Sequence, residues 1–177
     1  TWKIEAAGKI DADIAVTKDD EFPDLPRFGV RMFLDKKLSA VRYFGMGPQE
    51  SYCDKHQAAS HGLYQANVDD LHEDYIRPQE NGSHYDCEYV ELNNSRYGIV
   101  VSAKNAFSFN ASYYTQEELE EKTHNYELIE SDSVVFCVDY ALNGIGSNSC
   151  GPVVLEQYRF DDVLFRFQFT LIPYVKG

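Results

Sequence analysis

The stretch Val163-Leu164-Phe165-Arg166-Phe167-Gln168-Phe169-Thr170-Leu171-Ile172 decides the fold of this chain. Every second residue from Val163 to Leu171 is apolar, and three of the residues between them are polar. Because successive side chains of a strand point to opposite faces, this alternation predicts a long β-strand with one buried face. The same period of two recurs in Ala12-Ile14-Val16, Phe28-Val30-Met32-Leu34, Ile99 to Ala103, Phe107-Phe109-Ala111 and Phe136-Val138-Tyr140. Six or more strands without long helices between them predict an all-β fold, an antiparallel β-sandwich.

Helical signals are few. Thr115-Gln116-Glu117-Glu118 is a capping box, which predicts a short helix that begins after Thr115 and ends near Thr123. The acids of its first turns are interpreted as a solvated face that suits the helix dipole, not as a catalytic cluster. A second short helix is predicted between Ser51 and His61. Because linkers, repeats and low-complexity tracts are absent from the sequence, residues 1–177 are expected to form a single domain.

The composition of the chain limits the classes of partner that it is expected to bind. The chain has 177 residues, 44% of them hydrophobic and 14% aromatic, so a sizeable core is possible without disulfides. Its 29 acidic residues against 16 Lys plus Arg give a formal charge of −13, which repels nucleic acid and anionic lipid. No apolar run approaches the roughly 18 residues of a membrane span. We therefore expect neither nucleic acid nor a membrane as partner, whereas neutral ligands such as sugars remain open.

The sequence holds no strong catalytic or metal-binding motif. Its cysteines are interpreted as free thiols and fit a cytoplasmic protein, with export not excluded; they are Cys53, Cys87, Cys137 and Cys150. Cys53, His56 and His61 are spaced like no common zinc module, so no metal site is predicted. Glycoside hydrolysis with retention needs two carboxylates about 5 Å apart. The acids beside turns and strands are interpreted as surface residues and turn caps, and they include Glu50, Glu80 and Glu91. Phosphate loops, dinucleotide fingerprints and Gly-x-Ser-x-Gly elbows are lacking, so no catalytic residue and no cofactor are assigned.

Four marked segments, taken in order, resemble the C-terminal domain of family 2 β-galactosidases. Tyr43-Phe44-Gly45-Met46-Gly47-Pro48-Gln49-Glu50-Ser51-Tyr52, completed by Asp54, resembles the family's G-x-GPxExYxD turn. Tyr75 to Gly82 resembles its P-x-ENG turn. Phe107 to Ser112, with Tyr114 and a capped helix that reaches His124, is similar to its FN-S-Y strand and the helix after it. Gly144-Ile145-Gly146-Ser147-Asn148-Ser149-Cys150-Gly151-Pro152 resembles the G-x-G loop before the final strands.

The resemblance implies that this chain is the C-terminal part of the enzyme's last domain, a supersandwich related to galactose mutarotase. The intact enzyme would hydrolyse terminal β-D-galactosides such as lactose with retention. Its catalytic glutamates would lie in a TIM barrel of the same polypeptide, and its Mg and Na ions in other domains. The isolated chain, with no cofactor of its own, is then expected to be inactive. Separated from its neighbours it would expose strand edges, so we also expect self-association into a homo-oligomer.

The resemblance further implies a loop at the sugar pocket, formed by Gly146, Ser147, Asn148, Ser149 and Cys150. Well-known members carry a Trp platform where a gapped alignment places Cys150, and a cysteine offers no ring for stacking. We therefore expect this loop to wall the pocket, with Asn148 and Ser149 as its polar contacts.

A structural role is predicted for seven turn residues: Gly47, Pro48, Glu50, Pro78, Glu80, Asn81 and Gly82. Proline fixes φ, glycine permits unusual backbone angles, and the two glutamates are expected to accept hydrogen bonds from backbone N–H groups. Arg77 and His84 are lesser candidates for a surface that faces the barrel. Two alternatives stay open: a stand-alone carbohydrate-binding sandwich with exposed Tyr and Phe, and a mutarotase-like enzyme with an acid and a base in a concave sheet.

Overall fold

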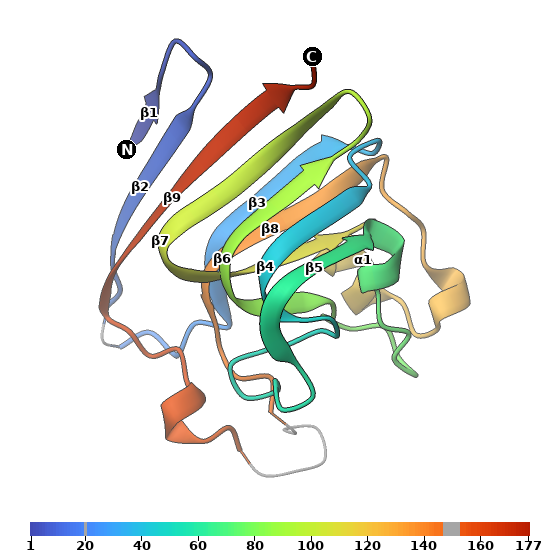
Figure 1. Cartoon of the computed structure of the whole chain (residues 1–177). Helices are drawn as coiled ribbons and strands as arrows, with labels where there is room; N and C mark the ends of the chain where they lie inside the picture. Colours follow the sequence, from blue (N-terminus) through green and yellow to red (C-terminus); the bar gives the residue numbers. More distant parts are fainter. Residues whose placement is uncertain (20, 147–152) are drawn as a thin grey trace.

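The computed structural model of the chain describes residues 1–19, 21–146 and 153–177. Within them the chain forms nine strands and several short helices, whose arrangement is drawn in Figure 1. The strands are β1 (Trp2–Ile4), β2 (Ile10–Thr17), β3 (Arg27–Asp35), β4 (Ala40–Gly47), β5 (Ser60–Asn67), β6 (Ser83–Asn93), β7 (Tyr97–Ser112), β8 (Ser133–Leu142) and β9 (Leu164–Val175). The helical segments are α1 (Gln116–Glu121) and the 3-10 turns η1 (Val68–Leu71), η2 (Asn125–Glu127) and η3 (Glu156–Tyr158).

The sheet forks along β7. Its strands run in the order β1-β2-β9-β7-β6-β4-β5, and β8 pairs with both β7 and β3. The first half of β7, residues 97–103, pairs with β9, whereas residues 108–112 pair with β8. The two apolar patterns expected around Ile99 and Phe109 therefore lie on one continuous strand, which passes from one layer of the sandwich to the other (Figure 1).

The two layers meet in an aromatic core. On β9 the alternating residues Phe165, Phe167 and Phe169 are buried, as the period of two predicts, and the residues between them are exposed. From the other layer, Phe28 and Tyr140 pack on Phe165 with ring centroids at 4.9 and 4.7 Å. Burial of each such ring contributes about 1.5–3 kcal/mol to folding. The predicted antiparallel, all-β sandwich is confirmed.

The predicted capped helix is confirmed and is slightly shorter than expected. Thr115 Oγ1 accepts a hydrogen bond from the Glu118 N–H at 3.1 Å, and α1 ends at Glu121, two residues before Thr123. Glu118 does not close the capping box, because its carboxylate accepts the N–H of Ile129 at 2.9 Å. In the part of the chain that the structure describes, no helix is long and apolar enough to cross a membrane.

The helix predicted between Ser51 and His61 is wrong. The segment is a turn in which Tyr52 and Lys55 pair as an isolated bridge. Its backbone groups form hydrogen bonds either across the turn or with other segments. The Ser51 N–H, for example, donates to the Ser83 carbonyl at 2.7 Å. A helix would require those groups for its own ladder, so pairing with the start of β6 overrides local propensity.

Candidate functional site

Hydrogen bonds between distant segments bring the four marked segments together at one set of loops. Glu50 accepts the Gly82 N–H at 2.8 Å, which joins the Pro48 turn to the Asn81-Gly82 turn. Asn110 on β7 donates to the Asn81 carbonyl. Asp54 accepts two N–H groups at the start of the Gly144 loop. The motifs thus form one connected framework.

Glu50 is the centre of the first turn. Besides Gly82, its carboxylate accepts hydrogen bonds from Lys55 and from the Tyr75 hydroxyl, and its side chain is 5% exposed. Burial raises the pKa of Glu50, but the hydrogen bonds from Lys55 and Tyr75 outweigh it, so the net shift is downward. The group is therefore an ionised anchor for three chain segments.

Glu80 differs from that expectation, because its observed partner is a guanidinium and not a backbone N–H. Arg27 Nη1 lies 3.1 Å from Glu80 Oε2, and Arg27 Nε donates to Asp139 Oδ1 at 3.2 Å. Burial raises the pKa of Glu80, and the negative charges of Asp139 and Glu50 raise it further. Arg27 lowers this pKa, but the net shift is upward. The Arg27 guanidinium thus pairs with two carboxylates, Glu80 and Asp139, in a half-buried cluster. Arg27 and Asp139 belong to no motif of the sequence, and the one signal that marks Asp139 is its place directly after the apolar residues 134–138.

The remaining turn residues pack against or form hydrogen bonds with other parts of this chain. The Gly47-Pro48 peptide is cis, and a Cβ on Gly47 would lie 2.2 Å from the Tyr43 hydroxyl. Pro78 is buried. Asn81 accepts the Glu73 N–H at 3.0 Å through its side chain and donates to the Gln79 carbonyl at 2.9 Å.

Gly82 supports a stability prediction. Its φ is +71°, and an added Cβ would lie 2.4 Å from the Leu71 carbonyl oxygen. Gly82→Ala should lower the free energy of unfolding by about 3 kcal/mol, the sum of the left-handed backbone cost and overpacking. Gly8→Ala is the matched control, since φ there is +88° but the nearest atom is 3.9 Å away. Urea unfolding measures both, and equal losses would show that the Leu71 contact has no effect.

Of the two lesser candidates, Arg77 is exposed but His84 is not. His84 is 1% exposed, and its ring is stacked on Phe109 with centroids 5.0 Å apart. Burial lowers its pKa to about 4, so the ring is neutral at pH 7. The expected surface role of His84 is wrong, because the register of β6 turns this side chain into the core.

The Gly144 loop is held by hydrogen bonds at its start. Asp54 accepts the N–H groups of Ile145 at 3.1 Å and Gly146 at 2.6 Å, and Gly144 N–H donates to the Tyr158 carbonyl at 2.8 Å. A Cβ on Gly144 would lie 2.8 Å from Val154 Cγ1, so the two stems pack closely. The remaining predicted loop residues lie outside the described residues; they are Ser147, Asn148, Ser149 and Cys150.

The cysteine and histidine residues considered for zinc contact separate carbonyls. Cys53 Sγ lies 3.7 Å from the Leu142 oxygen, and His56 Nδ1 lies 2.9 Å from the Tyr52 oxygen. His61 Nε2 lies 3.0 Å from the Asp86 oxygen. Across residues 1–19, 21–146 and 153–177, no three His, Cys, Asp or Glu side chains are grouped to hold a metal ion. Cys53, Cys87 and Cys137 are free thiols, and Cys150 is not among the described residues.

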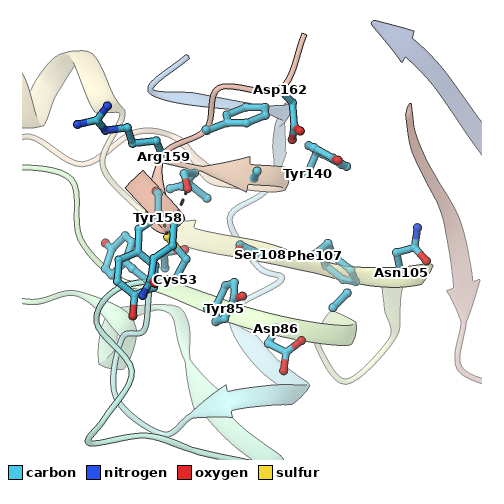
Figure 2. A pocket seen from close by; sticks show the side chains of 17 residues that line it. Cys53, Tyr85, Asp86, Asn105, Phe107, Ser108, Tyr140, Tyr158, Arg159 and Asp162 are labelled. Atoms are coloured by element: carbon cyan, nitrogen blue, oxygen red, sulfur yellow. Dashed lines mark hydrogen bonds between the residues drawn. The ribbon is translucent and has the colours of Figure 1, made fainter. Parts of the chain in front are cut away.

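A cavity of about 370 Å³ opens beside the stems of the Gly144 loop, where β7 changes its partner strand. Figure 2 shows side chains from β6, β7, β8 and the η3 segment around it. Aromatic and polar residues both line it, among them Tyr85, Asp86, Asn105, Phe107, Ser108, Tyr140, Tyr158 and Asp162.

Comparison with known proteins identifies the family. A family model described as beta galactosidase small chain matches residues 1–171. The β-galactosidase of Actinobacillus pleuropneumoniae is 51% identical over 171 residues, which are 97% of this chain and 17% of that protein. That of Staphylococcus xylosus is 39% identical with the same coverage, and that of Kluyveromyces lactis is 32% identical over 93% of this chain and 16% of its own length. The chain thus spans about a sixth of the length of these relatives. With its fold, its four ordered motifs and this match along nearly its whole length, the chain belongs to the β-galactosidase small-chain family.

Proposed function

We propose that this chain is the C-terminal β-sandwich part of a β-galactosidase, which packs against a TIM barrel and lends its Gly144 loop to the galactoside pocket. The observation that carries the proposal is the attachment of that loop to Asp54, at 3.1 and 2.6 Å. A loop that shapes a binding site needs stems fixed on a rigid scaffold. Asp54 supplies that attachment from the neighbouring turn, and the anchored turns around Glu50 and Gly82 stiffen the same end of the sandwich.

In this proposal, the intact enzyme hydrolyses terminal β-D-galactosides, and its catalytic acid and nucleophile lie outside this chain. The relatives are named β-galactosidases and are about six times longer than the part they share with this chain, which leaves room for that machinery elsewhere. Mg and Na ions would also bind in other domains. The isolated chain should then have no hydrolytic activity.

Complementation tests the proposal. The chain is mixed with the A. pleuropneumoniae β-galactosidase from which the matching segment has been deleted, and nitrophenyl-galactoside cleavage is measured. We expect no cleavage by either component alone and restored cleavage by the mixture. Cleavage by the isolated chain, full activity of the deleted enzyme, or an inactive mixture would each contradict the supporting role.

The loop assignment has its own test in the same assay. Asp54→Ala in this chain should lower kcat/KM of the mixture about tenfold or more, because a loop displaced by about 1 Å can cost a hundredfold. Asp132→Ala, at an exposed carboxylate before β8, is the matched control and should leave kcat/KM unchanged. Unchanged activity with Asp54→Ala would refute the loop's role and leave the supporting role standing.

A further inference from the structure

The strand order that begins at β1 ends at β5, which has a neighbouring strand on one side only. β5 pairs with β4 over its whole length and without a register shift, and Figure 1 shows it at the border of the sheet. An edge of this kind presents backbone N–H and C=O groups that another strand can bind. Natural proteins usually protect long edges with charged side chains, prolines or bulges.

β5 has none of these protections. Among the nine strands of the described residues, it is the only one without an acidic residue, a lysine or an arginine, and it contains no proline. The free edge of β3, by contrast, carries Arg31 and Asp35 and has a register shift in its pairing. β1 is three residues long and carries Lys3. In a chain with a formal charge of −13, the uncharged β5 edge is where a second copy meets the least repulsion.

The hydrogen bonds to β4 determine which backbone groups of β5 are free. Directly after the strand, the Val68 N–H donates to the Ser39 carbonyl at 2.9 Å, so the even-numbered residues of β5 bond to β4. Asn67 agrees with this alternation, because its N–H donates to Asp70 Oδ2 at 3.0 Å and not to β4. The free groups therefore belong to odd-numbered residues, which in the open part of the strand are His61, Leu63 and Gln65.

We propose that β5 pairs with β5 of a second copy of this chain, antiparallel and about a two-fold axis at Leu63. This register places Leu63 opposite its own counterpart and His61 opposite Gln65, so three residue pairs each exchange two hydrogen bonds. The Leu63 side chains, each 57% exposed in the single chain, become neighbours at the axis. Each Tyr64 lies opposite a Gly62 of the other copy, which leaves room for its ring.

A second copy is the partner that this edge fits best. Around the axis, the antiparallel register matches an apolar residue with an apolar residue and a polar one with a polar one. It also brings no charge of β5 against the negative charge of the other copy. The contact is formed by this chain alone, so it goes beyond the proposed role of the Gly144 loop and does not rest on it.

Sedimentation equilibrium of the chain tests the association. We expect the average mass to rise from one chain to two, with a midpoint on the order of 10 µM, because the interface is small. Raising the salt from about 0.05 M to about 0.5 M should favour the dimer, since it screens the repulsion between two acidic chains. A monomer that persists at about 500 µM, growth beyond two chains, or association that weakens with salt would overturn the proposal.

Charge variants at the axis test the register. Leu63→Lys and Leu63→Glu should each weaken the dimer about tenfold or more, because like charges would lie directly opposite one another. An equal mixture of the two variants should associate again, since opposite charges then meet at the axis. Phe33→Lys on the edge strand β3 is the matched control, at a ring that is 55% exposed, and should associate like wild type. A mixture that stays monomeric would overturn the axis at Leu63.

Amide hydrogen exchange locates the contact and does not depend on any variant. The N–H groups of His61, Leu63 and Gln65 should exchange more slowly at high than at low chain concentration. Those of Gly62 and Tyr64, which bond to β4, should exchange at the same rate at both. Protection that rises with concentration on β3 or on another surface instead would refute pairing through β5. None of these results depends on complementation, so the proposed function stands or falls separately.

Discussion

Replacing Arg27 with methionine will lower the free energy of unfolding by about 3 kcal/mol at pH 7, at the lower end of the 3–5 kcal/mol for a broken buried ion pair. The guanidinium lies between Asp139, whose side chain is 3% exposed, and Glu80, whose side chain is 30% exposed. Methionine preserves the apolar stem and removes the charge, so two carboxylates lose their shared cation. Because Glu80 is partly exposed, the loss of unfolding free energy is smaller than for a fully buried pair. Urea unfolding at pH 7 measures the change.

The pH dependence of this loss identifies its cause. Burial already raises the pKa of both carboxyls, and without Arg27 their folded-state pKa values will rise further above the unfolded values near 4. A carboxyl with a raised pKa binds protons on folding, so its destabilising effect is full above the folded-state pKa. The effect decreases as the pH falls through that pKa, and the variant should recover toward wild type near pH 5.

The control for this experiment is Arg96→Met, at an exposed arginine in the turn before β7. It should change stability by less than about 0.5 kcal/mol at either pH. A loss that is the same at pH 7 and pH 5 would mean that Arg27 acts through packing and not through charge.

Phe109→Ala will cost about 4 kcal/mol of unfolding free energy, within the 3–5 kcal/mol range for buried aromatic deletions. Phe109 is fully buried on the part of β7 that has joined the second layer. Its ring lies 5.0 Å from the rings of both His84 and Tyr43 and 6.5 Å from that of Phe136. The cavity left behind would separate residues of three strands at once, so it cannot collapse easily. Urea unfolding, with an unchanged m-value, measures the loss.

Phe33→Ala on β3 is the matched control, since that ring is 55% exposed. It should cost less than about 1 kcal/mol, because little apolar surface leaves water there on folding. If both variants lost the same amount, the burial of the Phe109 ring could not be the cause of the loss.

The sequence predicted well the features that depend on neighbouring residues. The alternation on β9 is one such feature, because a period of two is a property of consecutive residues and directs Phe165, Phe167 and Phe169 to one side. The cap at Thr115 is another, since its partner is three residues away. Local propensity failed between Ser51 and His61, where bonds to Ser83 replaced the helix.

Contacts between distant residues were not predictable from one sequence. Arg27 and Asp139 are 112 residues apart, and nothing near either of them specifies the other. The same holds for the orientation of His84, which depends on the register of β6 against β7. A shift of one residue in a strand moves every side chain to the other face.

For the candidate site, the sequence by itself determined which residue types stand in each turn and loop, and the family to which their order points. Only the tertiary structure decided that Glu50 bonds to Gly82, that Asp54 holds the Gly144 loop, and that Tyr85 and Tyr140 line one cavity. The cavity lies where β7 leaves β9 for β8. That exchange depends on strand pairing over long sequence separations, which residue patterns within a single segment do not encode.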